Sequence, residues 1–522
     1  MPNAAPPSSS EAVARRAPTA AARLSRPGSV RQRIGLVAGP AVAAVMLLVS
    51  PPDGLEVAAW RTAAVGLWMA IWWMSEALPI AATSLLPMVT FPLLGVAPIR
   101  DAAAPFANPL IFLFLGGFLI ALALEDVGLH RRIALGILTA VGSSRRRVVF
   151  GFMLASAFLS LWISNTATAM MMMPIALSVI TQMPRAAGDG AGETDDGHFS
   201  LALLLGVAYA CSVGGAATLI GTPTNALLAG YLLETYGYDI SFAAWMSIGL
   251  PVAAVGLGVV FLMLTRGLAD GEPVPQDLFD RERRDLGPMS LAERRVAAVF
   301  LGTAGLWLGR TALDDWIPGL SDTGIALFGA LLLFAWPMPR PEGSPRRAGD
   351  ALGVLDWSAT ARLPWGVLLL FGGGLSLAAA IQTTGLASWI GGGLGALDAL
   401  PIFWISLATV ALVVILTELT SNTATTAAFL PVLAALGVGL GEDPLLLLVP
   451  ATLAASCAFM LPVATPPNAI VYGSGRVTLP QMVGAGWRLN LVFIPLVTGL
   501  CYGLLTTLLG VQAGVLPPWA TP

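Results

Sequence analysis

Apolar segments long enough to cross a membrane fill most of this chain and are separated by short polar stretches. A transmembrane helix needs roughly 18–20 mostly apolar residues. Because a helix satisfies its backbone hydrogen bonds within one segment, the pattern predicts an all-α polytopic membrane protein. Segments close to the required length occur at about 35–50, 57–76, 79–98, 241–265, 296–313, 322–337 and 484–512, with a longer one at about 109–138.

Two further apolar segments are interrupted near their middle by small polar residues. The sequence Ser-Asn-Thr at 164–166 separates apolar residues 148–163 from 167–183, and the same three residues at 421–423 interrupt a segment at about 401–440. Each half is too short to span a bilayer comfortably. We therefore predict two re-entrant hairpins, whose polar tips are sheltered by protein or water.

Two more apolar segments, at about 200–232 and 445–475, are interrupted by proline. Gly221 and Ala464 each precede a Thr-Pro dipeptide in these segments. Proline removes a helical hydrogen bond and pushes the residue before it out of the helical region, so nearby carbonyls are left free. Free carbonyls are tolerated at membrane depth only where they line a cavity, so these segments predict broken helices at a site.

The interrupted segments form an internal repeat. Ser164 matches Ser421, and Gly128 matches Gly385, both with a shift of 257 residues. The later pair Asn225 and Asn468 is shifted by 243 residues, so the first copy holds 14 extra residues (257 less 243), which the polar stretch 184–199 accounts for as a predicted surface loop. Unrelated segments would not keep this register.

The placement of arginine predicts the orientation. Arginine clusters in residues 1–34, at 145–147 and in 266–295, and such clusters mark the cytoplasmic side. Counting from a cytoplasmic N-terminus gives about eleven transmembrane helices and a C-terminus on the other side. The bases of the two hairpins then face opposite sides, so the two copies form an inverted repeat.

The composition excludes several classes of protein. Of 522 residues, 56% are hydrophobic and 11% are charged, and the mean hydropathy is +0.79, which is far outside soluble usage. The three cysteines lie in apolar segments, so we expect no disulfide framework. The chain has two histidines, which excludes a multi-histidine metal site. For a membrane protein of this kind we expect no nucleic-acid partner.

The duplicated polar residues are candidates for cation binding. Ser164, Asn165, Ser421 and Asn422 offer hydroxyl and carboxamide oxygens of the kind that bind hard cations. Two further residues, Ser160 and Thr417, lie four positions before each serine and so on the same helical face. The backbone carbonyls of Gly221 and Ala464, just before the Thr-Pro pairs, complete the two clusters. The alternatives are polar bonds between helices and a packing kink, but duplication in constant register favours a site.

The same motifs are candidates for anion binding. Thr166 and Thr423 offer hydroxyl donors, and the N-terminus of a half-helix favours negative charge. No arginine lies near either motif along the chain, so a bound anion would need bound cations to balance its charge. Among the acids, Glu418 is left open as a supporting group, whereas the residues at the span ends are read as interfacial, namely Glu76, Glu125 and Asp126.

An intramembrane hydrolase that uses Ser164 or Ser421 is the rival from another class. Neither His130 nor His198 is near a motif along the chain, so a general base is missing. Catalysis also does not explain two equivalent sites. We expect a transporter and not an enzyme.

The paired Ser-Asn-Thr and Thr-Pro-x-Asn motifs resemble those of the divalent anion/sodium symporter family, the sodium:dicarboxylate and sodium:sulfate carriers. The sequence Trp-Trp-Met-Ser-Glu-Ala-Leu-Pro at 72–79 and the stretch from Ala455 to Val471 are similar to this family as well. The resemblance covers about residues 35–512. One departure is Thr224, where the family usually has proline.

The resemblance implies two sodium sites and a substrate site. The first sodium site would use Ser160, Ser164, Asn165 and the Gly221 carbonyl, and the second would use Thr417, Ser421, Asn422 and the Ala464 carbonyl. Substrate carboxylates would meet Asn165, Thr166, Asn422 and Thr423. Thr224 makes the first site less secure than the second.

The resemblance also implies a homodimer in a lipid bilayer, with an elevator-type mechanism. We expect Na⁺-coupled symport of a C4-dicarboxylate (succinate, malate or fumarate) across a bacterial inner membrane. An exchanger of the same fold, or a carrier of sulfate or citrate, stays open as an alternative function.

The chain is expected to divide into six parts. These are a disordered cytoplasmic tail (1–34), scaffold helices (35–108), transport-domain elements (109–232), scaffold helices and loops (233–361), transport-domain elements (362–476) and a last helix with the C-terminus (477–522).

Overall fold

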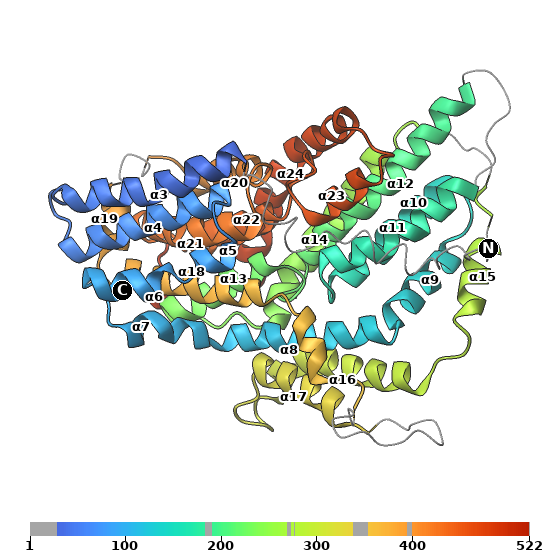
Figure 1. Ribbon diagram of the computed structural model, residues 1–522, viewed down its shortest axis with the longest axis horizontal. Coiled ribbons are helices and arrows are strands. Elements are labelled where there is room, and N and C mark those ends of the chain that lie inside the picture. The colour runs from blue at the N-terminus through green and yellow to red at the C-terminus, as the bar shows by residue number, and fades with distance from the viewer. Residues whose placement is uncertain are drawn as a thin grey trace, which may run out of the picture.

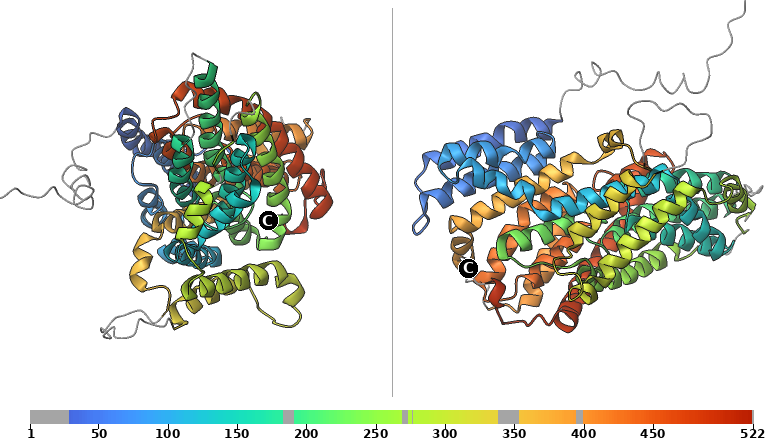
Figure 2. Two further views of the ribbon diagram at one scale, coloured as in Figure 1. Left: turned by 90° about the vertical axis from the view of Figure 1, so that its right-hand side faces the viewer. Right: turned by 90° about the horizontal axis from the view of Figure 1, so that it is seen from below.

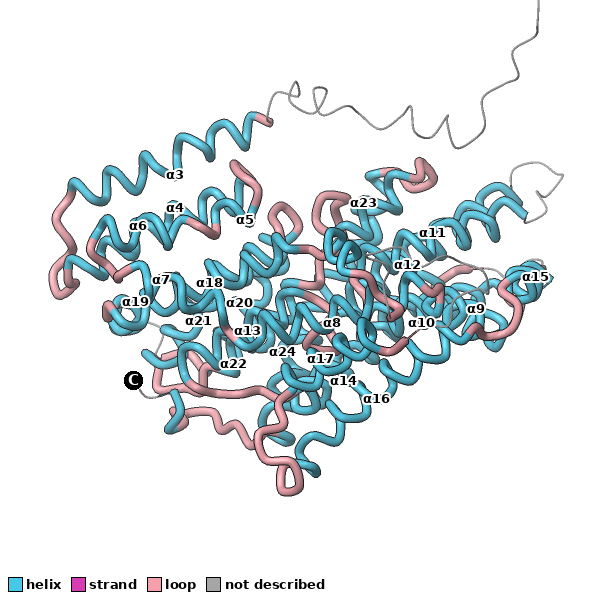
Figure 3. The backbone as a smooth tube through the Cα atoms, turned by 60° about the horizontal axis from the view of Figure 1, so that its bottom comes forward, coloured by secondary structure: helices cyan, strands magenta, loops and turns pink. Residues whose placement is uncertain are grey.

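The computed structural model describes residues 29–182, 191–268, 273–275, 277–337, 353–393 and 399–520, with backbone only at 191–196 and 277–278. Within these residues the chain is helical throughout, without a strand (Figure 3). The all-α prediction is confirmed. Residues 1–28, most of the predicted tail, lie outside the described residues. Helix α3 (Val30–Leu48) begins earlier than predicted, because Ser29 and Gln32 form a capping box at its start.

The two copies contain matching elements in the same order. The first copy comprises α8 (Pro109–Asp126), α9 (Leu129–Val141), α10 (Arg145–Ser160), α11 (Asn165–Gln182), α12 (Ala191–Gly215) and α13 (Pro223–Tyr236). The second comprises α18 (Trp365–Thr383), α19 (Leu386–Gly393), α20 (Ile402–Thr417), α21 (Asn422–Gly439), α22 (Leu445–Ala455) and α23 (Pro466–Gly473). Both predicted hairpins and both broken helices are therefore present.

The remaining helices flank the two copies. Helices α3 and α4 pack together at one edge of the molecule (Figure 2), and α17 packs along α8. Elements α9–α12 and α19–α22 lie toward opposite ends of the long axis, and the helix breaks lie between them (Figure 1). The flanking helices are α4 (Val57–Ser75), α5 (Ile80–Thr83), α6 (Leu86–Leu94), α7 (Ile99–Ala103), α14 (Phe242–Thr265), α15 (Asp277–Asp285), α16 (Leu291–Leu313), α17 (Asp322–Ala335) and α24 (Leu479–Leu508).

The predicted count of about eleven transmembrane helices stays a prediction. Among the described residues, eight helices are long and apolar enough to cross a membrane, and four more apolar helices are shorter. The predicted span at 79–98 is split into α5 and α6, because Pro87 has no N–H to continue the helix from Thr83. Helix α12 begins at Ala191, inside the stretch that was predicted as a loop.

Glycine divides the predicted segment 109–138 into two helices. Gly128 follows α8 with a φ of +74°, and Gly385 follows α18 with a φ of +78°. Residues with a side chain rarely adopt this left-handed conformation, which commonly ends a helix. The matched glycines therefore set the ends of α8 and α18 at equivalent places.

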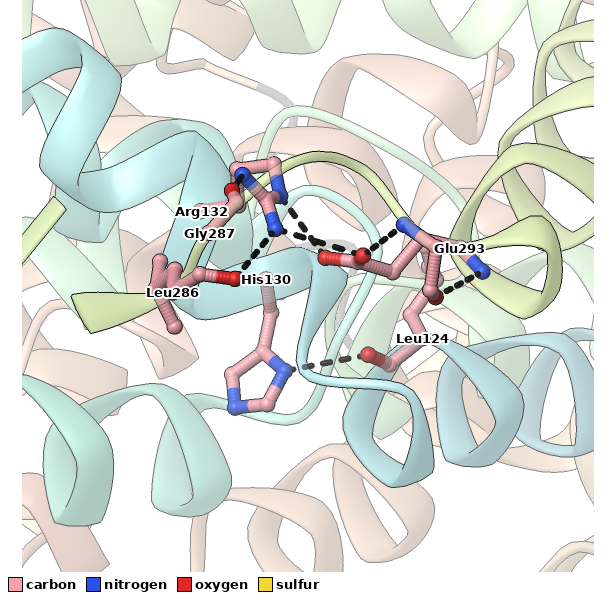
Figure 4. Close-up of polar contacts among 7 residues, drawn as sticks. Leu124, His130, Arg132, Leu286, Gly287 and Glu293 are labelled. Atoms are coloured by element: carbon pink, nitrogen blue, oxygen red, sulfur yellow. Dashed lines mark hydrogen bonds and ion pairs between the residues drawn. The ribbon is translucent and has the colours of Figure 1, made fainter. Parts of the chain in front are cut away.

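A network of hydrogen bonds connects α9 to neighbouring elements at one end of the molecule. The Nε of Arg132 donates to Glu293 at 2.7 Å, and its Nη1 donates to the Gly287 carbonyl at 2.9 Å (Figure 4). His130 on the same helix bonds the Leu124 carbonyl at 3.0 Å. These contacts join α8, α9 and the start of α16.

The inverted orientation of the hairpins predicts opposite labelling of their bases. A cysteine at Ser144, before α10, should react with impermeant maleimide from the cytoplasm only, and a cysteine at Leu400, before α20, from the other side only. Both positions are exposed, whereas the three native cysteines are buried and should give little background. Reaction of both positions from one side would contradict the inverted repeat.

Candidate functional site

A cavity of about 1140 Å³ lies where the hairpin tips and the helix breaks meet. Its lining contains residues from both copies, which are Ser164, Asn165, Thr166, Gly221, Ser421, Asn422, Thr423 and Ala464. Ser160 and Thr417 do not line it, since both are fully buried at the ends of α10 and α20. The structure thus brings eight of the ten candidate residues to one cavity.

Oxygen atoms crowd together in the first copy. A Cβ atom added to Gly215 would lie 2.5 Å from the Asn165 Oδ1 and 3.0 Å from the Gly221 carbonyl oxygen. One added to Gly221 would lie 2.9 Å from the Ser160 carbonyl oxygen. The Asn165 Oδ1 of this cluster is buried without a hydrogen-bond partner among the described residues. The Ser160 hydroxyl is likewise buried without such a partner, but it is the backbone carbonyl of Ser160 that lies at the cluster. Such an oxygen cluster with spare lone pairs fits a small hard cation.

The second copy repeats the main element of this cluster. The Asn422 Oδ1 is likewise buried without a partner among the described residues, and Ala464 is buried in the wall of the cavity. The Thr417 hydroxyl donates to the carbonyl of Val413 or Val414, at 3.0 and 3.1 Å. A hydroxyl oxygen that donates its proton still has lone pairs for a cation.

Two buried asparagines hold the broken helices open. The Asn225 Nδ2 donates to the Gly215 and Thr218 carbonyls at 3.4 and 2.8 Å, and the Asn468 Nδ2 donates to the Ala458 and Leu461 carbonyls, both at 3.1 Å. These acceptors correspond under the same shift of 243 residues. The two asparagines therefore form hydrogen bonds across the breaks. The repeat pairs them in the sequence, but nothing in the sequence assigns them this role.

Glu418 supports the second break. Its carboxylate accepts hydrogen bonds from the backbone N–H groups of residues 459–461 at 2.8–3.1 Å, and from the Asn490 amide at 2.7 Å. The side chain is buried and does not line the cavity. This resolves the open question about Glu418, which acts as a supporting residue through the backbone.

Four helices start at the wall of the cavity, namely α11, α13, α21 and α23. The Ser164 hydroxyl accepts from the Ala167 N–H at 3.2 Å, the Ser421 hydroxyl from the Ala424 N–H at 3.5 Å, and the Thr465 hydroxyl from the Asn468 N–H at 3.3 Å. The N-terminal ends of helices carry partial positive charge, so the cavity favours an anion. Thr166 and Thr423 add hydroxyl donors in the first turns of α11 and α21.

Charged residues also line this cavity, which corrects the expectation that no arginine lies near the motifs. The described lining contains Arg33 and Arg362, together with Glu76 and Glu125, so these charges balance. Arg362 is already paired with Asp126 at 2.5 Å. The charged residues of the described lining therefore add no net charge to the cavity.

The fold and the site define a class of protein. Two helix pairs interrupted at Ser-Asn-Thr and two broken helices place amide and hydroxyl oxygens and helix N-termini around one cavity in an apolar, helical chain. Two of these oxygens, Asn165 Oδ1 and Asn422 Oδ1, are buried without a hydrogen-bond partner among the described residues. This arrangement is typical of the substrate and ion site of a secondary membrane transporter. A hydrolase is not supported, because neither histidine lines this cavity.

Comparisons with known proteins identify the family. Residues 31–509 match the family described as the sodium:sulfate symporter transmembrane region. The chain is 40% identical over 494 residues to the sodium-dependent dicarboxylate transporter SdcS of Staphylococcus aureus strain USA300, with 93% of this chain and 94% of SdcS covered. The SdcS proteins of other strains, such as MSSA476, match at the same level.

Two solved structures share the fold at low sequence identity. Neisseria gonorrhoeae MtrF, from a class of antimetabolite efflux pumps, has a TM-score of 0.54 at 14% identity, with 91% of this chain and 98% of MtrF covered. The Alcanivorax borkumensis YdaH transporter has a TM-score of 0.51 at 15% identity, with 92% and 97% covered.

The chain belongs to the sodium:sulfate symporter family. It is a membrane transporter and not an enzyme, as the sequence predicted.

Removal of the Glu418 carboxylate should destabilise the protein. Glu418→Ala leaves three backbone N–H groups and the Asn490 amide without their acceptor, and we expect a loss of at least about 2 kcal/mol. Thermal unfolding in detergent measures it. The control is Glu442→Ala, whose carboxylate accepts one bond, from the Gly514 N–H at an exposed position. Equal melting temperatures for the two variants would contradict the role of Glu418.

Proposed function

We propose that this transporter couples the uptake of a C4-dicarboxylate to the inward movement of Na⁺. The observation that carries the proposal is a pair of buried oxygens, Asn165 Oδ1 and Asn422 Oδ1, at equivalent places in the two copies; neither has a hydrogen-bond partner in the described part of the chain. Unpaired buried acceptors are costly unless a ligand completes them. The relatives with 40% identity are sodium-dependent dicarboxylate transporters, which supports the assignment of ligand and substrate.

The proposed sodium sites follow the two oxygen clusters. The first uses Ser160, Ser164, Asn165 and the Gly221 carbonyl, and the second uses Thr417, Ser421, Asn422 and the Ala464 carbonyl. Neither contains a carboxylate, which suits a monovalent cation that binds and leaves in every cycle. The contact between Asn165, Gly215 and Gly221 supports the first assignment. Helix α13 begins at Pro223 even though Thr224 replaces the usual proline, which argues that Thr224 does not disturb the site.

The proposed substrate site lies between the sodium sites. The carboxylates accept hydrogen bonds from the side chains of Asn165, Thr166, Asn422 and Thr423 and face the four helix N-termini. Because the charged residues of the described lining balance one another, the bound Na⁺ ions balance the charge of the dianion. This is the physical basis of coupling, since each ligand stabilises the binding of the other.

The proposal extends to the movement, assembly and location of the protein. The hairpins and broken helices (within 109–232 and 362–476) form a transport domain that moves as an elevator against the scaffold helices (35–108 and 233–361) in a homodimer. The protein lies in the bacterial inner membrane with its N-terminus in the cytoplasm. The placement of arginine and the family membership support these assignments.

Proteoliposomes decide between the remaining alternatives. Labelled succinate should accumulate with an inward Na⁺ gradient and not with choline, and citrate and sulfate should compete weakly. Succinate uptake that needs internal succinate and not Na⁺ would favour the exchanger, and preferential uptake of sulfate or citrate would change the substrate. The retained oxygen clusters argue for the symporter, because an exchanger has no need of them.

Removal of the two threonine hydroxyls should weaken substrate binding. Thr166→Val and Thr423→Val keep the shape of the side chain, and each should cost roughly 1–3 kcal/mol of substrate binding, the price of one buried polar partner. The half-saturating concentration of succinate at saturating Na⁺ measures it. Thr507→Val is the control, since it removes an exposed hydroxyl from α24. Unchanged half-saturation in both site variants would place the carboxylates elsewhere.

Removal of the buried hydroxyls below the cavity should weaken sodium binding. Ser160→Ala and Thr417→Ala should raise the Na⁺ concentration for half-maximal uptake, and saturating Na⁺ should restore the apparent affinity for succinate. The control is Ser156→Ala, one turn earlier on α10, which removes a second buried and unpaired hydroxyl outside the proposed site. Wild-type Na⁺ dependence in both site variants would overturn the assignment.

A further inference from the structure

A second cavity, of about 430 Å³, lies between the ends of α12, α14 and α24. Helix α14 packs against both of the other helices and lies between them. The polar lining consists of His198, Arg266, Gln481 and Arg488, and the apolar lining includes Leu201, Met263, Leu264 and Leu489. This groove is separate from the cavity at the hairpin tips, with which it shares no described lining residue.

The polar residues of this groove offer donors without a matching acceptor. Arg266 and Arg488 are exposed, and within the described residues neither forms an ion pair. The Gln481 Oε1 accepts from the Thr478 N–H and hydroxyl, both at 2.9 Å, so its amide N–H₂ group is left to donate. No acid is among the described lining residues. The described lining of the groove is therefore complementary to an anion.

The first turn of α24 adds to this preference. Gln481 belongs to the capping box at the start of this 30-residue helix, and the N-terminus of a helix carries partial positive charge. The Arg488 guanidinium lies 5.9 Å from the centre of the Trp487 ring. Tryptophan and arginine side by side are typical of the boundary between the bilayer core and water.

The surroundings of the groove indicate a lipid and not a soluble anion. Leu262 on α14 and Leu491 on α24 are 67% and 58% exposed, so the apolar surface continues beyond the groove. The groove also lies toward the arginine-rich end of the molecule. After α14, the Val274 N–H donates to the Ser143 carbonyl at 2.8 Å, in the loop between α9 and α10. This is the end that the arginine pattern places at the cytoplasm, where anionic lipids are enriched.

We propose that this groove binds an anionic phospholipid of the cytoplasmic leaflet. The phosphate lies between Arg266 and Arg488, within reach of the amide of Gln481, and an acyl chain lies along the apolar lining. The lipid thereby joins the ends of α14 and α24. The proposal does not depend on which substrate or cation the transporter carries.

Native mass spectrometry of the full-length protein in detergent tests the proposal with three probes. These are dioleoylphosphatidylglycerol, dioleoylphosphatidylcholine and sn-glycerol 3-phosphate, which has the phosphate without the chains. We expect phosphatidylglycerol to bind more tightly than the other two. Arg266→Gln with Arg488→Gln should weaken its binding about 30-fold, the effect of two basic residues near a membrane surface.

Matched variants keep the test decisive. Arg100→Gln with Arg294→Gln removes the same charge from two exposed positions outside the groove and should leave phosphatidylglycerol binding unchanged. Arg266→Lys with Arg488→Lys keeps the charge and should bind better than the glutamine pair. Equal binding of phosphatidylcholine, equal loss in the control pair, or no gain from lysine would overturn the proposal. Equally tight binding of glycerol 3-phosphate would show a soluble anion as the ligand instead.

Discussion

The structure depends on satisfying the backbone hydrogen-bonding groups that are freed where helices break at membrane depth. An unpaired backbone group in an apolar environment costs several kcal/mol, so a break needs partners. Asn225 and Asn468 supply them by donating to carbonyls on either side of their breaks. The Gly221 and Ala464 carbonyls, which the proposed sodium sites use, lie in the same two breaks. The asparagine amides that satisfy the breaks are therefore close in sequence to the atoms proposed for binding.

The two copies meet this constraint with different side chains. In the second, Glu418 accepts from three consecutive N–H groups of the break. The first copy has Leu161 at the matching position, and there the Thr218 hydroxyl accepts from the Gly221 N–H at 3.0 Å and donates to the Leu161 carbonyl at 2.6 Å. Thr218 in turn matches Leu461 under the shift of 243 residues. Besides its asparagine, each copy therefore has a second polar support, Thr218 in the first copy and Glu418 in the second. The asparagine support is the same in both copies, whereas the second support differs in its chemistry.

The sequence predicts much of this architecture because its main signals are local or repeated. Apolar length locates the helices, proline locates the breaks, and the constant shift pairs Ser164 with Ser421. It does not predict the short interruption between α5 and α6 at Ser84, or the roles of Asn225 and Asn468, which depend on carbonyls up to ten residues away. Arg33 and Arg362 reach the cavity from distant parts of the chain, and hydropathy carries no signal of such contacts.

The distribution of charge in the main cavity bears on how binding and movement are related. A dianion that met a fixed arginine at the hairpin tips would be held by the protein alone, and its binding would need no cation. Here the described lining holds two arginines and two glutamates, whose charges balance, and Arg362 is already paired to Asp126. Arg31 also reaches the backbone just before the second Ser-Asn-Thr motif, where it donates to the Leu419 carbonyl at 2.7 Å. The other polar groups of the lining are dipoles, which are amides, hydroxyls and helix ends. Dipoles orient an anion but do not neutralise it. Under the proposed function, the cations of the two sodium sites balance the charge of the dianion, and this is the physical basis of the proposed coupling.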